Sequence, residues 1–86
     1  MTSAFTDPNQ TVVYGLDTCD DTTRARAFFD DAGHPYRYVN LDHEPAIRSE
    51  LHAAGLTATP VVVDPSGRIE VEPSNEVLGA MVGSSA

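Results

Sequence analysis

Two kinds of apolar pattern alternate along this chain, and their order limits the folds that it can adopt. Short β-branched or alternating runs, typical of strands, occur at 11–14, 36–41, 61–63 and 68–71. Between and after them lie stretches whose apolar residues are three and four positions apart, which is typical of amphipathic helices. The predicted order is strand, helix, strand, helix, strand, strand, helix.

Each of the three predicted helices also has residues that favour its start or its end. The first begins at Asp20 and stops at Gly33, a residue favoured just after a helix. The second begins near Pro45, which a first helical turn tolerates, and stops at Gly55. Ser74 can cap the third. The apolar stripes are Ala25, Phe28, Phe29 and Ala32 in the first helix, Ile47, Leu51 and Ala54 in the second, and Val77, Leu78, Met81 and Val82 in the third.

The connections between the strands predict how the strands pair. A strand–helix–strand unit pairs its strands in parallel, so 11–14 and 36–41 should be parallel. The short segment between Val63 and Arg68 contains Pro65 and Gly67 and predicts a tight turn between antiparallel strands. A mixed four-stranded sheet with helices on both faces satisfies both conditions. This α/β layout is that of the thioredoxin fold.

Length and composition predict a single domain. The chain has 86 residues, too few for a second domain, and 41% of them are hydrophobic, which suits one small core. Residues 1–10 are polar and lack periodicity, so we expect a flexible tail followed by one domain over 11–86. We see neither an apolar run of about 20 residues nor a signal-peptide pattern. One cysteine also suits a reducing compartment, so we expect a cytoplasmic protein.

The charge of the chain limits the classes of partner that it can bind. Thirteen acidic residues stand against five arginines and no lysine, giving a formal net charge of −8. Nucleic acids and anionic membranes require clustered cations, whereas these arginines are scattered. We therefore expect neither as a partner. His34, His43 and His52 lack the spacing of metal ligands, so the sequence predicts no metal site.

Two features carry candidate chemistry. Cys19 lies between the first predicted strand and the first helix, where unpaired N–H groups and the helix dipole stabilise a thiolate. A lone cysteine can also be a small buried apolar residue, and this alternative stays open. The second feature is Thr59-Pro60, placed before the third strand where no ladder donor is needed. An ordinary trans bond is the alternative there.

Three segments carry a family resemblance: Tyr14-Gly-Leu-Asp-Thr-Cys19, Ala58-Thr-Pro-Val-Val62 and Pro73-Ser-Asn-Glu-Val77. In this order and spacing they resemble glutaredoxins, most closely the mycoredoxin and NrdH-like redoxin branch, over residues 11–82. The resemblance implies a thiol–disulfide oxidoreductase without a tightly bound cofactor. Glutathione or mycothiol would be its co-substrate, and thiolated proteins would be its substrates.

The resemblance also implies roles for individual residues. Cys19 would be the attacking thiol, and the Thr59–Pro60 bond would be cis, with Pro60 facing Cys19. Thr59 would pair main chain to main chain with the bound thiol compound. Ser74 and Asn75 would receive a carboxylate at the start of the last helix, as helix starts generally can.

The motif around the cysteine departs from the family. Glutaredoxins usually have Cys-x-x-Cys or Cys-Gly-Phe-Ser, whereas this chain has Cys19-Asp20-Asp21-Thr22. With Thr22 in place of a second cysteine, we expect a monothiol cycle in which a second small thiol releases the mixed disulfide. Thr22 can still donate a hydrogen bond to the sulfur. Asp17, Asp20 and Asp21 oppose a thiolate, so we expect the pKa of Cys19 to be lowered less than in active redoxins.

Three functions stay open at this point. The first is the monothiol redoxin, which we expect to be a monomer. The second is a thioredoxin-fold binding module without catalysis, whose acidic rim around Cys19 meets a partner protein. The third is an iron–sulfur carrier, in which two chains each donate Cys19 and two small thiols complete the cluster.

Overall fold

The computed structural model describes residues 4–84. Within them, β1 (Thr11–Gly15), β2 (Tyr36–Asn40), β3 (Val61–Val63) and β4 (Ile69–Val71) form one sheet in the order β2-β1-β3-β4. β1 and β2 are parallel, while β1–β3 and β3–β4 are antiparallel. The predicted parallel pair and the predicted hairpin are both confirmed.

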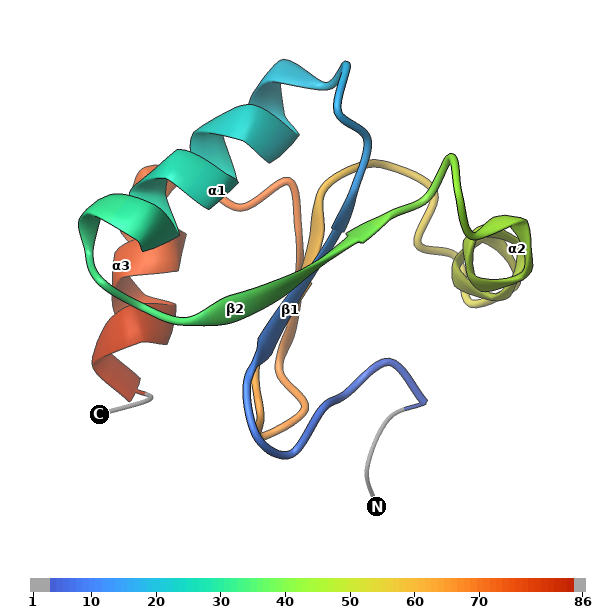
Figure 1. The fold of residues 1–86 in the computed structure, drawn as a ribbon. Coiled ribbons are helices and arrows are strands. Elements are labelled where there is room, and N and C mark those ends of the chain that lie inside the picture. The colour runs from blue at the N-terminus through green and yellow to red at the C-terminus, as the bar shows by residue number, and fades with distance from the viewer. Residues whose placement is uncertain (1–3, 85–86) are drawn as a thin grey trace.

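Helices cover both faces of this sheet. α1 (Asp20–Asp31) and α3 (Asn75–Ser84) lie on one face, and α2 (Pro45–Ala53) lies on the other (Figure 1). Gly33 and Gly55 follow α1 and α2 with φ angles of 64° and 81°, a backbone region that favours glycine. The structure therefore has the α/β, thioredoxin-like layout that the sequence predicts. No helix within residues 4–84 is long and apolar enough to cross a membrane.

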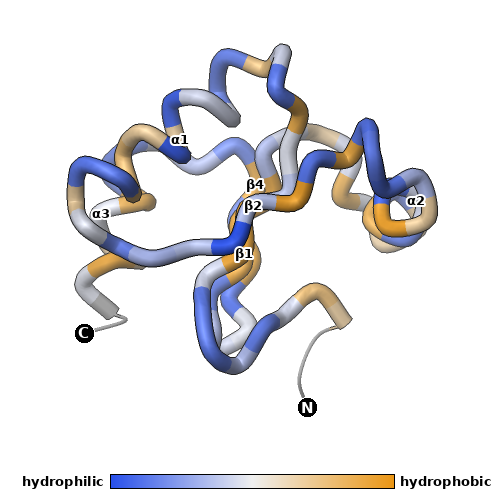
Figure 2. The backbone as a smooth tube through the Cα atoms, in the orientation of Figure 1, coloured by the Kyte–Doolittle hydropathy of each residue, from blue (hydrophilic) through white to orange (hydrophobic). Residues whose placement is uncertain are grey.

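The core consists of two clusters, one on each face of the sheet. Because alternate residues of a strand point to opposite faces, β1 and β3 supply side chains to both clusters. Hydrophobic residues gather in the central strands, whereas hydrophilic residues predominate along α1 (Figure 2). The α2 side contains Val12, Tyr14, Leu41, Leu51, Val61 and Val63, and the side of α1 and α3 contains Val13, Ala25, Phe29, Val62, Leu78 and Met81.

The predicted helical stripes are wrong at their last positions. Ala32 and Ala54 are the residues that follow α1 and α2, and both are exposed. Each helix ends one residue earlier than its stripe requires, so the last alanine leaves the buried face. In α2 the contact with the sheet is made by Leu51 and by the partly buried Ile47.

Residues 5–10 depart from the expected flexible tail. The Tyr14 hydroxyl donates a hydrogen bond to the Phe5 carbonyl at 2.6 Å, and the two rings pack edge to face. Phe5 also packs against the α2-side cluster, and Asp7 pairs with Gln10 in an isolated bridge. Phe5 is the one aromatic residue of a polar segment, so the segment shows no apolar periodicity from which this packing could be predicted. Residues 1–3 of the expected tail, and 85–86 of the expected domain, lie outside the described residues.

Candidate functional site

Cys19 is the N-cap residue of α1. Its extended backbone, with φ −88° and ψ 120°, leads the chain from β1 into the helix. Its N–H donates to the Leu16 carbonyl at 3.0 Å, which closes a turn in the loop. The side chain makes no capping hydrogen bond and is partly exposed, so the sulfur is available for other contacts.

The thiol of Cys19 lies against the loop that precedes β3. Its S–H donates to the Thr59 carbonyl, with 3.5 Å between sulfur and oxygen. The Thr59–Pro60 peptide bond is cis, which confirms the prediction, and Pro60 is buried. The Pro60 carbonyl in turn accepts a hydrogen bond from the N–H of Glu72 at 2.8 Å. Residues 40 positions apart thus meet at the start of α1.

Thr22 lies one turn into α1, on its buried side. Its side chain is buried, and its hydroxyl accepts a hydrogen bond from the Leu16 N–H at 3.4 Å. A Cβ at Gly15 would come within 2.6 Å of the Thr22 hydroxyl oxygen. The end of β1 and the first turn of α1 can therefore approach this closely because Gly15 has no side chain.

Hydrogen-bond donors hold the pKa of Cys19 below its ordinary value of 9.0. The largest effect is the side-chain hydrogen bond from Thr59, and burial acts in the opposite direction. The hydroxyl and N–H of Thr22 and the N–H of Asp21 lower the pKa further because they attract the thiolate, without a capping hydrogen bond to the neutral thiol. These N–H groups are available because the first turn of a helix has no intrahelical acceptors for them. Thr22 therefore favours the thiolate, the direction expected of a hydrogen bond from its hydroxyl to the sulfur, and that bond stays a prediction.

Two of the aspartates near Cys19 are engaged elsewhere. Asp17 accepts hydrogen bonds from the Tyr38 hydroxyl and the Asn40 amide, and Asp21 lies 3.5 Å from the Arg24 guanidinium. None of the aspartate carboxylates is among the main influences on the Cys19 pKa. The predicted opposition to the thiolate is therefore weaker than sequence proximity indicates, because proximity does not fix where a side chain points.

Ser74 and Asn75 lie at the start of α3. The Ser74 hydroxyl accepts a hydrogen bond from the Val77 N–H at 3.2 Å, so the predicted cap is confirmed. Arg24 of α1 contacts Asn75: its Nη1 donates a hydrogen bond to the Asn75 side-chain oxygen at 2.7 Å. Arg24 Nη2 also donates to the Pro73 carbonyl at 3.0 Å.

Arg24 is a residue of this region that the sequence does not single out. Its only local signal is its position three residues after Asp21, which favours an ion pair on a helix. Nothing in the sequence marks its contacts with residues 49 and 51 positions away.

The structure divides the predicted site residues into two groups. Thr22 and Thr59 meet around the Cys19 sulfur, and Pro60 follows Thr59 directly. Ser74 and Asn75 are at the start of α3, where the Arg24 contact joins them to α1. Within residues 4–84 there is no group of three or more His, Cys, Asp or Glu residues that could hold a metal ion.

Comparisons with known proteins point to one family. Residues 11–65 match the family model described as Glutaredoxin. A glutaredoxin (grx-1) from Archaeoglobus fulgidus has a TM-score of 0.74 at 22% identity, with 85% of each chain covered. The glutaredoxin-like protein NrdH-redoxin from Escherichia coli has a TM-score of 0.75 at 17% identity, over 81% of this chain and 91% of that one. No curated protein matches.

The family match spans β1, the loop with Cys19, α1, β2, α2 and β3. It includes both segments that meet at the sulfur, and the two solved structures share the fold. The chain therefore belongs to the glutaredoxin family.

Proposed function

We propose that the protein is a monothiol thiol–disulfide oxidoreductase that acts through Cys19 on mixed disulfides with a low-molecular-weight thiol. The observation that carries this proposal is the environment of the sulfur. Cys19 is the partly exposed N-cap residue of α1, where the first-turn N–H groups have no intrahelical acceptors, and the hydroxyl groups of Thr59 and Thr22 lower the pKa of its thiol. A lowered pKa raises the fraction of thiolate, which is the attacking form. Membership of the glutaredoxin family supports thiol–disulfide exchange as the class of reaction.

The proposed cycle has two exchange steps. In the first, the Cys19 thiolate attacks the small-thiol sulfur of a thiolated protein. The old disulfide bond breaks, and the protein sulfur leaves as a thiolate that takes up a proton. In the second, the thiolate of another small thiol attacks the sulfur now attached to Cys19. A disulfide of two small thiols leaves, and Cys19 returns to its thiolate form.

Thr22 makes the second step intermolecular. Its hydroxyl cannot form a disulfide, so a second small thiol has to resolve the Cys19 adduct. The same hydroxyl stabilises the Cys19 thiolate, which is both the attacking and the leaving group of the cycle.

For the bound thiol compound we propose two contact regions. The main chain of Thr59, beside the cis bond to Pro60, would pair with the main chain of the compound. The backbone N–H groups at the start of α3, at Ser74 and Asn75, would receive its carboxylate. The side-chain oxygens there already accept hydrogen bonds from Val77 and Arg24.

Glutathione and mycothiol are the proposed co-substrates, and thiolated proteins are the proposed partners. The net charge of −8 repels an anionic thiol such as glutathione, so we expect slower exchange with it than with an uncharged thiol. We propose that the protein works as a monomer in the cytoplasm, where small thiols keep cysteines reduced.

Mass spectrometry after incubation with oxidised glutathione and with oxidised mycothiol tests the proposal. We expect one small-thiol adduct per chain, absent from Cys19→Ser and removed by the matching reduced thiol. The urea-unfolded protein serves as the reference for an unassisted thiol. If the folded protein forms an adduct more slowly than this reference with both disulfides, the proposal fails and the binding-module function gains support.

A further inference from the structure

Asp17 ties the loop that carries Cys19 to β2. Its Oδ1 accepts a hydrogen bond from the Tyr38 hydroxyl at 2.7 Å, and its Oδ2 accepts one from the Asn40 side-chain amide at 3.1 Å. Tyr38 and Asn40 are two residues apart on β2 and therefore lie on the same face of the strand. Because each carboxylate oxygen accepts a hydrogen bond from a side chain of β2, the Asp17 carboxylate has one preferred orientation.

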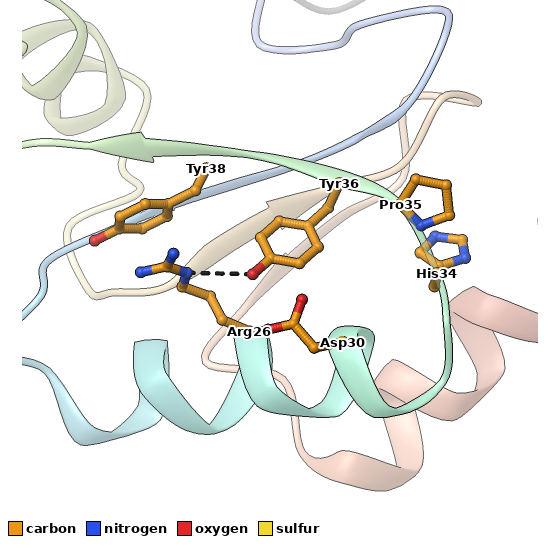
Figure 3. Close-up of a pocket in the computed structure, with 6 residues that line it drawn as sticks. All are labelled: Arg26, Asp30, His34, Pro35, Tyr36 and Tyr38. Atoms are coloured by element: carbon orange, nitrogen blue, oxygen red, sulfur yellow. Dashed lines mark hydrogen bonds between the residues drawn. The ribbon is translucent and has the colours of Figure 1, made fainter.

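Arg26 of α1 contacts the same residues from the helix side. Its Nη1 lies 4.0 Å from Asp17 Oδ1, and its guanidinium carbon is 3.8 Å from the centre of the Tyr38 ring. Its Nε donates to the Tyr36 hydroxyl at 3.3 Å. Figure 3 shows the guanidinium next to both tyrosines. Arg26 and the two tyrosines also border a hollow of about 370 Å³. Its lining residues are Arg26, Asp30, His34, Pro35, Tyr36 and Tyr38.

The hydrogen bond from Tyr38 to Asp17 persists over the pH range in which a thiol ionises. Burial, followed by the interaction with Asp17, raises the pKa of Tyr38 to about 12. The phenol therefore keeps its proton at neutral pH and continues to donate it to Asp17.

We propose that Asp17 is a positioning residue for Cys19: Tyr38 and Asn40 hold its carboxylate on the β2 side of the loop, which fixes the 16–19 turn and keeps this charge away from the sulfur. The turn is closed by the Cys19 N–H and the Leu16 carbonyl, so the placements of Asp17 and Cys19 are coupled. The inference rests on the proposed function, because it concerns the reactivity of the same thiol. A carboxylate released from its donors would stand two residues from the sulfur and oppose the thiolate.

The decisive variant is Tyr38→Phe, which keeps the ring beside Arg26 and removes the hydroxyl that holds Asp17. We expect the Cys19 pKa to rise by about 0.5–1 unit, the effect of a carboxylate about 7 Å away at an effective dielectric of 40–50. Below that pKa, the iodoacetamide rate should fall about 3- to 10-fold. Asn40→Ala removes the other donor without touching the aromatic packing and should shift the pKa in the same direction.

Asp17→Ala separates the positioning role from a general loss of structure. In an Asp17→Ala background there is no carboxylate to release, so adding Tyr38→Phe should leave the Cys19 pKa unchanged. Tyr36→Phe is the matched control, since it removes a neighbouring hydroxyl that bonds Arg26 and not Asp17. Amide hydrogen exchange at Thr18 and Cys19 should accelerate in Tyr38→Phe and stay unchanged in Tyr36→Phe.

Two results would overturn the inference. One is a Tyr38→Phe protein whose Cys19 pKa and loop exchange match those of the wild type. The other is a Cys19 pKa that Tyr38→Phe raises equally in the wild-type and in the Asp17→Ala background. Alkylation needs no disulfide substrate, so a failure of thiol exchange by the wild-type protein leaves this test intact and is distinguishable from it.

Discussion

Arg24 of α1 donates a hydrogen bond to Asn75 of α3, with Nη1 and Oδ1 2.7 Å apart across 51 positions of sequence. The same guanidinium reaches the Pro73 carbonyl at 3.0 Å. α1 and α3 are therefore joined by a polar contact at the start of α3, in addition to their shared apolar cluster. The contact places the segment proposed to receive a carboxylate beside the helix that begins after Cys19.

Removing this contact should destabilise the protein. Hydrogen bonds to charged groups contribute about 1.5–3 kcal/mol, but the Arg24 side chain is 35% exposed. Solvent screening lowers the expected loss for Arg24→Ala to about 1 kcal/mol. Urea unfolding measures it. Arg48→Ala is the control, because Arg48 lies 3.5 Å from Asp42 on the surface and should contribute at most about 0.5 kcal/mol. Equal losses in both variants would contradict the prediction.

A cysteine at position 22 should form an internal disulfide with Cys19. The two positions are one helical turn apart, within the distance that a disulfide spans. We expect Thr22→Cys to lose both free thiols under mild oxidant while remaining monomeric, as seen by mass spectrometry and thiol counting. Ala27→Cys is the control, because about 12 Å of helix separates it from Cys19. A Thr22→Cys protein that keeps both thiols would show that the first turn of α1 is arranged differently.

The threonine hydroxyl groups should control the ionisation of Cys19 in a fixed order. Thr59→Val removes the largest lowering influence, so the pKa should rise more than in Thr22→Val. At a pH below the pKa the thiolate fraction then falls and alkylation slows. Well above pH 9 all variants should react alike. The iodoacetamide rate against pH measures this, with the exposed Thr57→Val as control. A larger rise in Thr22→Val would reverse the assignment.

Replacing Glu72 with glycine should stabilise the protein. Its φ of 48° lies in the left-handed region, where a residue with a Cβ is strained by about 1–2 kcal/mol. Part of this gain is lost to the greater freedom of glycine in the unfolded chain. Glu72→Gly should therefore raise the free energy of unfolding by up to about 1 kcal/mol, whereas Glu72→Gln, which keeps the Cβ, should not. Thermal and urea unfolding of the two variants test the difference.

The charge of a small disulfide should affect its reaction with Cys19. The net charge of −8 favours a cationic compound and disfavours an anionic one. At low salt we expect cystamine to react faster than hydroxyethyl disulfide, and dithiodiglycolate to react more slowly, after correction for the intrinsic reactivity of each with a free thiol. The differences should shrink in 1 M salt, where the Debye length is about 3 Å. Rates that do not depend on charge or salt would contradict this expectation.

The sequence contains the local signals that set the order of the elements. Gly33 ends α1, Pro45 begins α2, and the three valines of β3 form a buried strand, each through a property of neighbouring residues. The short turn after β3 also fixes the hairpin, because few residues can reverse the chain there. The packing of Phe5 on Tyr14 has no such local signal, because it depends on the position of a distant strand.

The same distinction applies to the site. Cys19 at the start of a helix follows from the neighbouring pattern, whereas only the family resemblance implies the cis bond before Pro60. The orientation of Asp17 toward Tyr38 could not be inferred, since the two residues are 21 positions apart. Sequence proximity placed three carboxylates near the sulfur, whereas the tertiary structure directs at least two of them to other partners.

Two separate requirements fix the number of residues between Pro60 and Asp64: the packing of β3 in the core and the positions of the two flanking residues. The three valines of β3 are fully buried, and they alternate between the two core clusters. Insertion of a single residue in this segment would exchange the faces of the side chains that follow it. It would also move Pro60 relative to the thiol or displace Asp64, whose carboxylate accepts hydrogen bonds from the turn into β4. A change of length in β3 therefore damages the core and the thiol site together, whereas loops remote from both tolerate insertions.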